Sequence, residues 1–492
     1  MSRTTAEKAS HDDVREHAQR GTRQFLIARA CVVASSFVAS AILTRALGPS
    51  NFGVYGVVIS QLMWLEMLMN AGIPSATAQL MADSRHDQAA VESSARALLV
   101  GWSLALLATC WIAAPWVADL MRIPNGTVLL RIALLDLPFM AIFVSYDGAL
   151  NGRRLFGILA AVQVAYGAIK LAGILLLVVL GISVEGALAA YVVSTGVLAA
   201  VLAVRYRPFG SRPRAPIVRE ILAITAPMAL YLVSIQVLLS LDLWSLKALW
   251  TGPGEVLGHY VASMNLSKML LVISGAQSGV VFASVAWALA EGNAARARHH
   301  IQDATRFGLI LATAAWVLLV LNGSEVLSLL YSRPYADGDR FLPLQLAALA
   351  ILVLLDILEA ALMAAGHRWS IAGILLATVP FAWLGNVVLI PLLGPIGAAA
   401  SLLLGVVIAT VTVGIIAYRR FGALVRASTL GRVLVAAAVV GLASTLYPVH
   451  GPLVLVKLGV LGVLYFFVLF GLGEVTKDDF RILRGRPVSA SA

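Results

Sequence analysis

Long apolar stretches alternate with short polar ones along the whole chain. Most of them are about 20 residues long, which is the length that an α-helix needs to cross a bilayer core of about 30 Å. They predict fourteen transmembrane helices, at approximately 25–44, 53–73, 97–119, 128–149, 156–180, 184–204, 221–248, 257–289, 307–330, 342–365, 370–390, 396–417, 433–449 and 453–473. The fold class is therefore all-α and integral to the membrane.

The composition supports a membrane protein and explains the charge. Hydrophobic residues make up 60% of the 492 residues and charged residues only 12%, whereas about 25% are charged in a soluble domain. The net charge of +11 arises from basic residues in alternate loops, as the positive-inside rule describes. With these loops in the cytosol, both termini are cytosolic. We expect contact with anionic membrane lipids and no nucleic-acid partner.

Motifs of soluble enzymes do not occur in the sequence. There is no HExxH, CxxC, Walker loop or GxGxxG pattern, and both cysteines, Cys31 and Cys110, fall inside predicted spans. We therefore expect no catalytic residues, no metal site and no disulfide. The longest outside loop, YSRPYADGDRFLP, is too short to house a catalytic domain. This favours a transporter without a cofactor over an enzyme.

The two halves of the chain share one sequence plan. LGPSNFGVY at 47–55 is repeated as TGPGEVLGHY at 251–260, and SYDGALNGRRLFGILAA at 145–161 aligns with ILEAALMAAGHRWSIAG at 357–373. Internal repeats are common in transporters. The repeat predicts a cytosolic N-terminal tail, a six-helix lobe, a basic cytosolic linker, a second six-helix lobe, two extra helices and a cytosolic C-terminal tail, at 1–24, 25–206, 207–220, 221–418, 433–473 and 474–492.

Four stretches in register resemble a known family. LTRALGPSNFGVY, LDLWSLKALWTGPGEVLGHY, YSRPYADGDRFLPLQLAALA and NVVLIPLLGPIGAAAS are similar to segments of the polysaccharide transporter family, the Wzx-type flippases for lipid-linked oligosaccharide. These flippases belong to the multidrug/oligosaccharidyl-lipid/polysaccharide superfamily, which is MATE-like. The resemblance covers about residues 20–420.

The resemblance implies a function and a location. It implies alternating access that moves undecaprenyl-pyrophosphate-linked oligosaccharide from the inner to the outer leaflet of a bacterial cytoplasmic membrane. The product would serve O-antigen, exopolysaccharide or capsule synthesis, with a glycan polymerase and export machinery as candidate partners. A MATE-like drug/cation antiporter is the alternative, and a membrane glycan polymerase or glycosyltransferase is less favoured because the outside loops are short.

Ionisable residues inside predicted spans are candidate site residues, because each costs about 2.5–3.5 kcal/mol at the centre of a membrane helix. The resemblance places the first, second, seventh and eighth spans around a central cavity. It makes Arg29, Arg45, Lys247 and Lys268 candidates for binding the pyrophosphate headgroup. For Arg45 the alternative is an interaction with phosphates of membrane lipids. For the others the alternative is a structural ion pair.

Four acidic residues are candidates for coupling to a proton or sodium ion, or for the acidic lining of the cavity: Glu66, Asp242, Asp356 and Glu359. For Glu66 and Asp242 the alternative is a structural ion pair between helices. For Asp356 and Glu359 it is helix capping or a hydrogen bond between helices. Two further intramembrane residues, Lys170 and Lys457, are expected at the periphery. Five prolines within or near spans are candidates for helix kinks, at positions 74, 138, 227, 343 and 380.

Overall fold

The computed structural model describes residues 3–83, 85–153, 155–179, 183–206, 211–422 and 425–476. Only the backbone is described for residues 3–30, 33, 177–179, 273 and 276. The tails predicted at 1–24 and 474–492 and the linker at 207–220 thus lie partly outside the described residues. The side chain of Arg29 also lies outside them.

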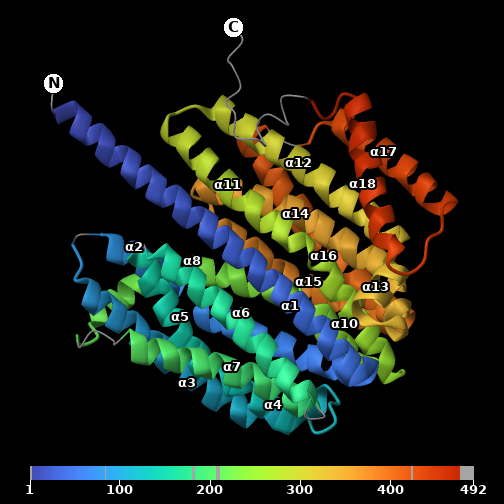
Figure 1. Ribbon diagram of the computed structural model, residues 1–492, viewed down its shortest axis with the longest axis horizontal. Helices are drawn as coiled ribbons and strands as arrows, with labels where there is room; N and C mark the ends of the chain where they lie inside the picture. The colour runs from blue at the N-terminus through green and yellow to red at the C-terminus, as the bar shows by residue number, and fades with distance from the viewer. Residues whose placement is uncertain are drawn as a thin grey trace. The chain divides into compact units, whose positions relative to one another are not determined.

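The described chain is helical and contains no strand (Figure 1). It has 13 helical segments long and apolar enough to cross a membrane. The first of them, Ala34–Ala82, covers two predicted spans. The helix is interrupted between these spans at Gly48 (φ 69°, ψ 170°). Counted as two, this segment brings the total to the fourteen expected from hydropathy. The predicted all-α membrane fold is confirmed.

The chain forms two compact units, residues 1–240 and 241–492. The first unit contains α1 (Arg3–Asn70), α2 (Ile73–Ala82), α3 (Gln88–Leu120), α4 (Gly126–Leu134), α5 (Asp136–Gly152), α6 (Phe156–Val179), α7 (Val184–Arg205) and α8 (Ala215–Leu238). The sequence assigned α8 to the second lobe, but α8 packs against α1, α2 and α3.

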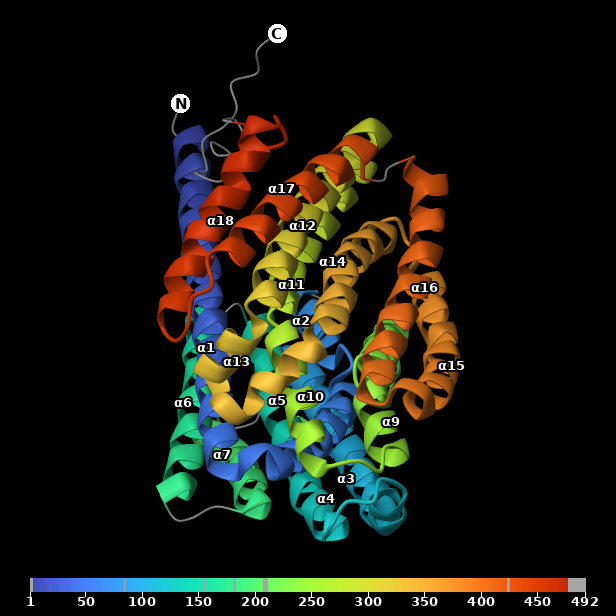
Figure 2. The ribbon, with the colours of Figure 1, turned by 90° about the vertical axis from the view of Figure 1, so that its right-hand side faces the viewer.

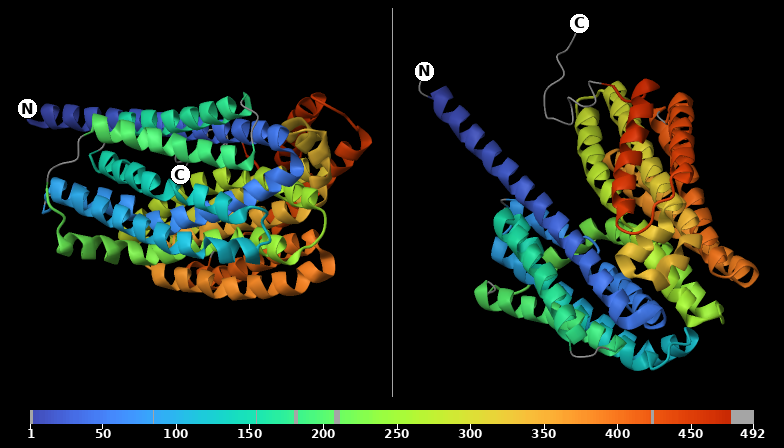
Figure 3. Two further views of the ribbon diagram at one scale, coloured as in Figure 1. Left: turned by 90° about the horizontal axis from the view of Figure 1, so that it is seen from below. Right: turned by 45° about the vertical axis from the view of Figure 1, so that its right-hand side comes forward.

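The core of the first unit joins α2, α3 and α5 to the end of α1 and to α7 and α8. Small residues allow close helix contacts in membranes. At Gly148, a Cβ atom would lie 2.9 Å from Pro74 Cα, so α5 and α2 approach each other directly. The long α1 runs alongside α6, as the views in Figures 1 and 3 also show.

The second unit contains α9 (Leu241–Leu249), α10 (Gly254–Ser267), α11 (Leu270–Ala290), α12 (Ala294–Leu321), α13 (Gly323–Tyr331), the 3₁₀ helix η1 (Arg333–Arg340), α14 (Leu342–Ala364), α15 (Arg368–Leu393), α16 (Pro395–Phe421), α17 (Ala427–Leu446) and α18 (Leu453–Gly471). The last two helices pack against α12 through a shared apolar core (Figure 2). The Tyr465 hydroxyl in this core donates a hydrogen bond to the Ile310 carbonyl at 3.1 Å.

Several predicted single spans are divided in the structure. The interruptions fall at Leu135, between α8 and α9 at Leu239–Ser240, between α10 and α11 at Lys268–Met269, and at Asn322. None of these positions is a proline, so hydropathy and proline content did not reveal them. They matter for function because two of them adjoin candidate site residues.

Candidate functional site

Four side chains from four helices gather inside the first unit, and we call them the Glu66 cluster: Glu66 on α1, Asp136 on α5, Lys170 on α6 and Tyr191 on α7. The Tyr191 hydroxyl donates a hydrogen bond to Glu66 Oε1 at 3.3 Å. The Lys170 ammonium lies 4.1 Å from the centre of the Tyr191 ring. Asp136 is fully buried, and the charges of Glu66, Asp136 and Lys170 interact. The lysine therefore offsets part of the cost of burying two carboxyl groups.

A second cluster, the Asp242 cluster, lies in the second unit and comprises Asp242, Tyr260, Ser263, Lys268 and Gln345. Asp242 is in the first turn of α9, and the Tyr260 hydroxyl from α10 donates a hydrogen bond to its Oδ2. Gln345 Oε1 on α14 accepts a hydrogen bond from Ser263 Oγ at 2.6 Å, and its Nε2 donates to the Tyr260 carbonyl at 3.5 Å. Lys268 and Asp242 attract each other electrostatically. Both units thus combine carboxylate, tyrosine and lysine.

The two predicted carboxylates, Asp356 and Glu359, both lie on α14. Asp356 Oδ2 accepts a hydrogen bond from Ser274 Oγ on α11, and Glu359 is 1% exposed. The contact of Asp356 links two neighbouring helices, which is the structural use that the sequence left open.

The predicted cations differ in their surroundings. Arg45 is exposed on α1, three residues before the interruption at Gly48, and Lys247 is half-buried in the last turn of α9. Arg45 belongs to the first unit, whereas Lys247 and Lys268 belong to the second. For Lys268, an electrostatic interaction with a predicted acid, Asp242, is described.

A family model described as polysaccharide biosynthesis protein matches residues 24–282, just over half of the chain. The chain belongs to this family. The resemblance inferred from the four sequence motifs is thereby confirmed. No curated protein shows a significant sequence match to the chain.

Solved structures show which fold the chain has. It resembles the lipid II flippase MurJ in an inward closed conformation, with a TM-score of 0.74 and 14% identity over 94% of this chain and 99% of that one. An inward-facing multidrug resistance MATE transporter of the MOP superfamily gives 0.66 and 16%, over 79% of this chain and 94% of that one. The eukaryotic MATE transporter AtDTX14 gives 0.60 and 16%, over 81% and 96%.

The position of Lys170 differs from the expectation of a peripheral residue. Its ammonium faces the rings of Tyr166 and Tyr191, at 5.9 and 4.1 Å from their centres. A signal was present in the sequence, because Gln163, Tyr166 and Lys170 are spaced i, i+3 and i+7 and share one face of an otherwise apolar helix. Gln163 Nε2 donates to Asp147 Oδ1 at 3.0 Å, so this face carries polar contacts along its length.

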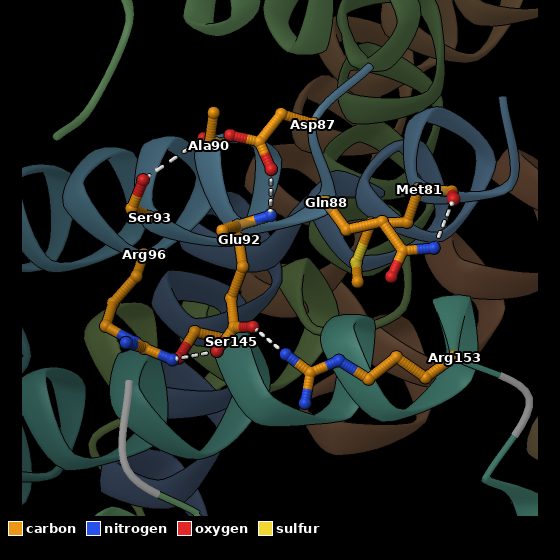
Figure 4. Close-up of polar contacts among 10 residues, drawn as sticks. Met81, Asp87, Gln88, Ala90, Glu92, Ser93, Arg96, Ser145 and Arg153 are labelled. Carbon is orange, nitrogen blue, oxygen red and sulfur yellow. Dashed lines mark hydrogen bonds and ion pairs between the residues drawn. The ribbon is translucent and has the colours of Figure 1, made fainter. Parts of the chain in front are cut away.

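A buried glutamate joins two arginines at one end of the first unit (Figure 4). The side chain of Glu92 on α3 is 4% exposed and accepts hydrogen bonds from Arg96 at 2.6 Å and from Arg153, which follows α5. Arg96 also donates to Ser145 Oγ at 3.4 Å and stacks on Tyr146. Arg153 belongs to the repeated Gly152-Arg153-Arg154 motif. Its role in the described chain is thus to fix α5 against α3.

The second unit has a comparable group just beyond α18. Glu474 is 3% exposed and accepts hydrogen bonds from Arg306 Nε on α12 at 2.9 Å, and from Arg432 Nη1 and Thr429 Oγ1 on α17 at 2.9 and 2.8 Å. Burial alone would raise the pKa of Glu474, but these donors hold the pKa below its usual value. The group fastens the two extra helices to α12.

Among the described residues, no group of three His, Cys, Asp or Glu side chains is placed to hold a metal ion. The chemistry that the described site offers is therefore that of hydrogen bonds and of paired charges, arranged around tyrosine hydroxyls at membrane depth.

Proposed function

We propose that the protein is a flippase for undecaprenyl-pyrophosphate-linked oligosaccharide. It would move this lipid from the inner to the outer leaflet of a bacterial cytoplasmic membrane by alternating access of its two lobes. The lipid-linked glycan would then enter synthesis of a surface polysaccharide such as O-antigen, exopolysaccharide or capsule.

The match of the chain to the polysaccharide biosynthesis family carries this proposal. The fold shared with a lipid II flippase is consistent with it. The physical requirement also fits, because a pyrophosphate-sugar headgroup cannot cross bare hydrocarbon and needs cations and polar groups that replace its hydration. Arg29, Arg45, Lys247 and Lys268 are the residues that we propose for this task.

Deletion of the gene tests the function in cells. We expect surface glycan to be lost while the lipid-linked precursor accumulates on the cytosolic side, and purified protein in liposomes to transfer a lipid-linked oligosaccharide across the bilayer. Sensitivity to cationic drugs without any change in surface glycan would instead identify a MATE-like antiporter. If the surface glycan had shorter chains while the precursor still crossed the membrane normally, the result would point to a polymerase.

We also propose that a proton or sodium gradient drives turnover. A coupling ion must bind the two access states with different affinity, since equal affinity shifts no equilibrium. Asp242, Glu66, Asp356 and Glu359 are the candidate binding groups, in that order. If collapsing both gradients leaves flipping in liposomes unchanged, the substrate gradient alone drives transport and these carboxyl groups are structural.

The proposed topology places both termini and the segments rich in arginine in the cytosol. The first part of α12, which carries Arg296, Arg298 and Arg306, is one such segment. The turn before α10 and the helix η1 would face the outside, because they alternate with the basic segments along the chain.

This topology predicts the labelling of single cysteines by a reagent that cannot cross the membrane. After replacement of Cys31 and Cys110, cysteines at Gly252 or Asp337 should react in intact cells, whereas a cysteine at Asn293 should react only after permeabilisation. Mass spectrometry of the labelled protein gives the readout. Reaction of the Asn293 position in intact cells would invert the topology.

A further inference from the structure

Three arginines lie at one end of the helical hairpin formed by α15 and α16, and we call them the arginine group: Arg368, Arg419 and Arg420. The two helices are joined at Gly394 and pack side by side (Figure 2). Arg368 is the first residue of α15, and Arg419 and Arg420 are in the last turn of α16. Because Arg368 and Arg420 are equally far from the turn in the sequence, antiparallel helices of equal rise bring them to the same level.

The arginine group carries positive charge that the described chain does not neutralise. Its three side chains are exposed, and no acidic side chain among the described residues pairs with them. The acids described at this end of the second unit bind other cations: Glu291 binds Arg296, Asp303 binds His299, and Glu474 binds Arg306 and Arg432. The end of α16 is already capped, because Arg298 Nε donates to the Phe421 carbonyl at 2.6 Å. The arginine group is therefore not needed for capping.

The first unit uses the equivalent motif differently. Gly152-Arg153-Arg154 follows α5, and its counterpart Gly366-His367-Arg368 follows α14. In the first unit, Arg153 binds the buried Glu92. In the second unit, no acid among the described residues binds Arg368. The motif thus serves packing in one lobe, whereas its copy presents a cation at the surface of the other.

Exposed apolar side chains lead along the hairpin to the arginine group. On α16 they recur at helical spacing on one face and are 41–57% exposed: Leu404, Ile408, Val411, Ile415 and Tyr418. On α15, Trp369 is 62% exposed beside Arg368. Tyrosine and tryptophan are enriched where the hydrocarbon of a bilayer meets the headgroups. The arginine group therefore lies at headgroup depth, at the end of a surface suited to acyl chains.

We propose that the arginine group binds the phosphate of an anionic phospholipid, whose acyl chains lie along the exposed face of α16. The general attraction of a basic protein to anionic lipid needs no defined site. Here three guanidinium groups at one level, two aromatic side chains at the same depth and an apolar track define one. Guanidinium groups bind phosphate oxygens through paired hydrogen bonds. The site does not depend on the proposed transport, and the proposed topology places its lipid in the cytosolic leaflet.

Charge determines which phospholipid the arginine group selects. Phosphatidylcholine carries its own cation beside the phosphate, and this cation competes with the arginines for the phosphate oxygens. Phosphatidylglycerol has no such cation and carries a net negative charge. The lipid also reduces the repulsion between the neighbouring charges of Arg419 and Arg420. An anionic lipid should therefore bind in preference to a zwitterionic one.

The test counts the lipids bound to the purified full chain by native mass spectrometry, during titration with phosphatidylglycerol in micelles of a non-ionic detergent. Phosphatidylcholine is the comparison lipid. We expect the wild type to retain phosphatidylglycerol in preference to phosphatidylcholine. The triple variant Arg368→Gln, Arg419→Gln, Arg420→Gln should bind phosphatidylglycerol about a hundredfold more weakly, because each arginine near anionic lipid contributes about 1 kcal/mol, or about fivefold. Equal retention of the two lipids by the wild type would overturn the proposal.

A matched control removes the same charge elsewhere. Arg205, Arg212 and Arg219 are exposed arginines of the first unit. In about 0.15 M salt, exposed charges more than about 8 Å apart are largely screened, so replacing these three by glutamine should keep the wild-type affinity. Equal weakening in both triple variants would overturn the site, because it would show a general attraction. If the triple variant of the arginine group does not fold, Arg420→Gln alone replaces it, with an expected loss of about fivefold.

Transport measured in phosphatidylcholine liposomes separates this site from the substrate path. The folded triple variant of the arginine group should translocate lipid-linked oligosaccharide at the wild-type rate, because the site binds a membrane lipid and not the transported one. Loss of transport in this variant would assign the arginine group to the substrate and overturn the phospholipid. A wild type that binds phosphatidylglycerol through the arginine group but transports no lipid-linked oligosaccharide would support the site and contradict the proposed function.

Discussion

Replacing Lys170 by methionine should abolish glycan export and lower the stability of the protein. The substitution leaves Glu66 and Asp136 without the ammonium group that neutralises one of their charges. Lys170 acts on both carboxyl groups through its charge and contacts the Tyr191 ring. We therefore expect the free energy of unfolding to fall by about 2 kcal/mol, with protonation of the carboxyl groups limiting the loss. Complementation of a deletion strain measures export, and thermal unfolding in detergent measures stability.

Two further variants make the Lys170 result specific. Lys457→Met removes another intramembrane lysine, whose ammonium donates one hydrogen bond to the Ser444 carbonyl at 2.9 Å, and it should change stability by only about 1 kcal/mol. Adding Glu66→Gln to Lys170→Met should recover much of the lost stability, because one uncompensated charge disappears. Losses that simply add in the double variant would show that Lys170 and Glu66 do not interact.

Replacing Glu474 by alanine should loosen the two C-terminal helices from α12. The change removes the acceptor for Arg306, Arg432 and Thr429 at once, and a hydrogen bond to a charged group contributes about 1.5–3 kcal/mol. We expect a lower unfolding temperature and faster proteolysis between α16 and α17. Asp303→Asn breaks an exposed pair with His299 and should cost less than about 1 kcal/mol.

Glu474 should also make the stability of the folded protein depend on pH, in a direction that its pKa defines. Its pKa is lowered in the folded protein, so its contribution to stability is complete above the unfolded value of about 4.3. The contribution is lost as the pH falls through the lower, folded value. Thermal unfolding of the wild type should therefore lose stability in acid more steeply than that of Glu474→Gln. Parallel acid profiles of the two proteins would contradict this role.

Much of the fold was accessible from the sequence because the membrane imposes a simple rule. A backbone in hydrocarbon must satisfy its own hydrogen bonds, so long apolar stretches such as 396–417 and 453–473 have to be helices. The gap predicted between the spans 25–44 and 53–73 contains Gly48, where the helix is interrupted and φ is positive. Family membership followed from the four sequence motifs.

Which charged side chains lie beside one another could not be predicted from the sequence in the same way. Hydropathy locates Lys170 and Asp136 within spans but does not tell which helix lies beside which, and the contact of α6 with α1 and α7 is a property of the folded lobe. The division of 221–248 and of 257–289 into two helices each was also missed, because the residues at the interruptions, Leu239, Ser240, Lys268 and Met269, do not break helices by themselves.

The interruptions also bear on hydration. Where a helix stops within the bilayer, main-chain carbonyl groups lose their intrahelical donors and need water or another polar group. Asp242 follows one such point by two residues, and Lys268 stands at another. Short bonds within the chain take up several of these carbonyl groups, since Ser240 N donates to the Val237 carbonyl and Met269 N donates to the Leu266 carbonyl. Straightening either helix would therefore change the need for water little, and would instead turn the side chains that follow the interruption, Asp242 among them, about the helix axis.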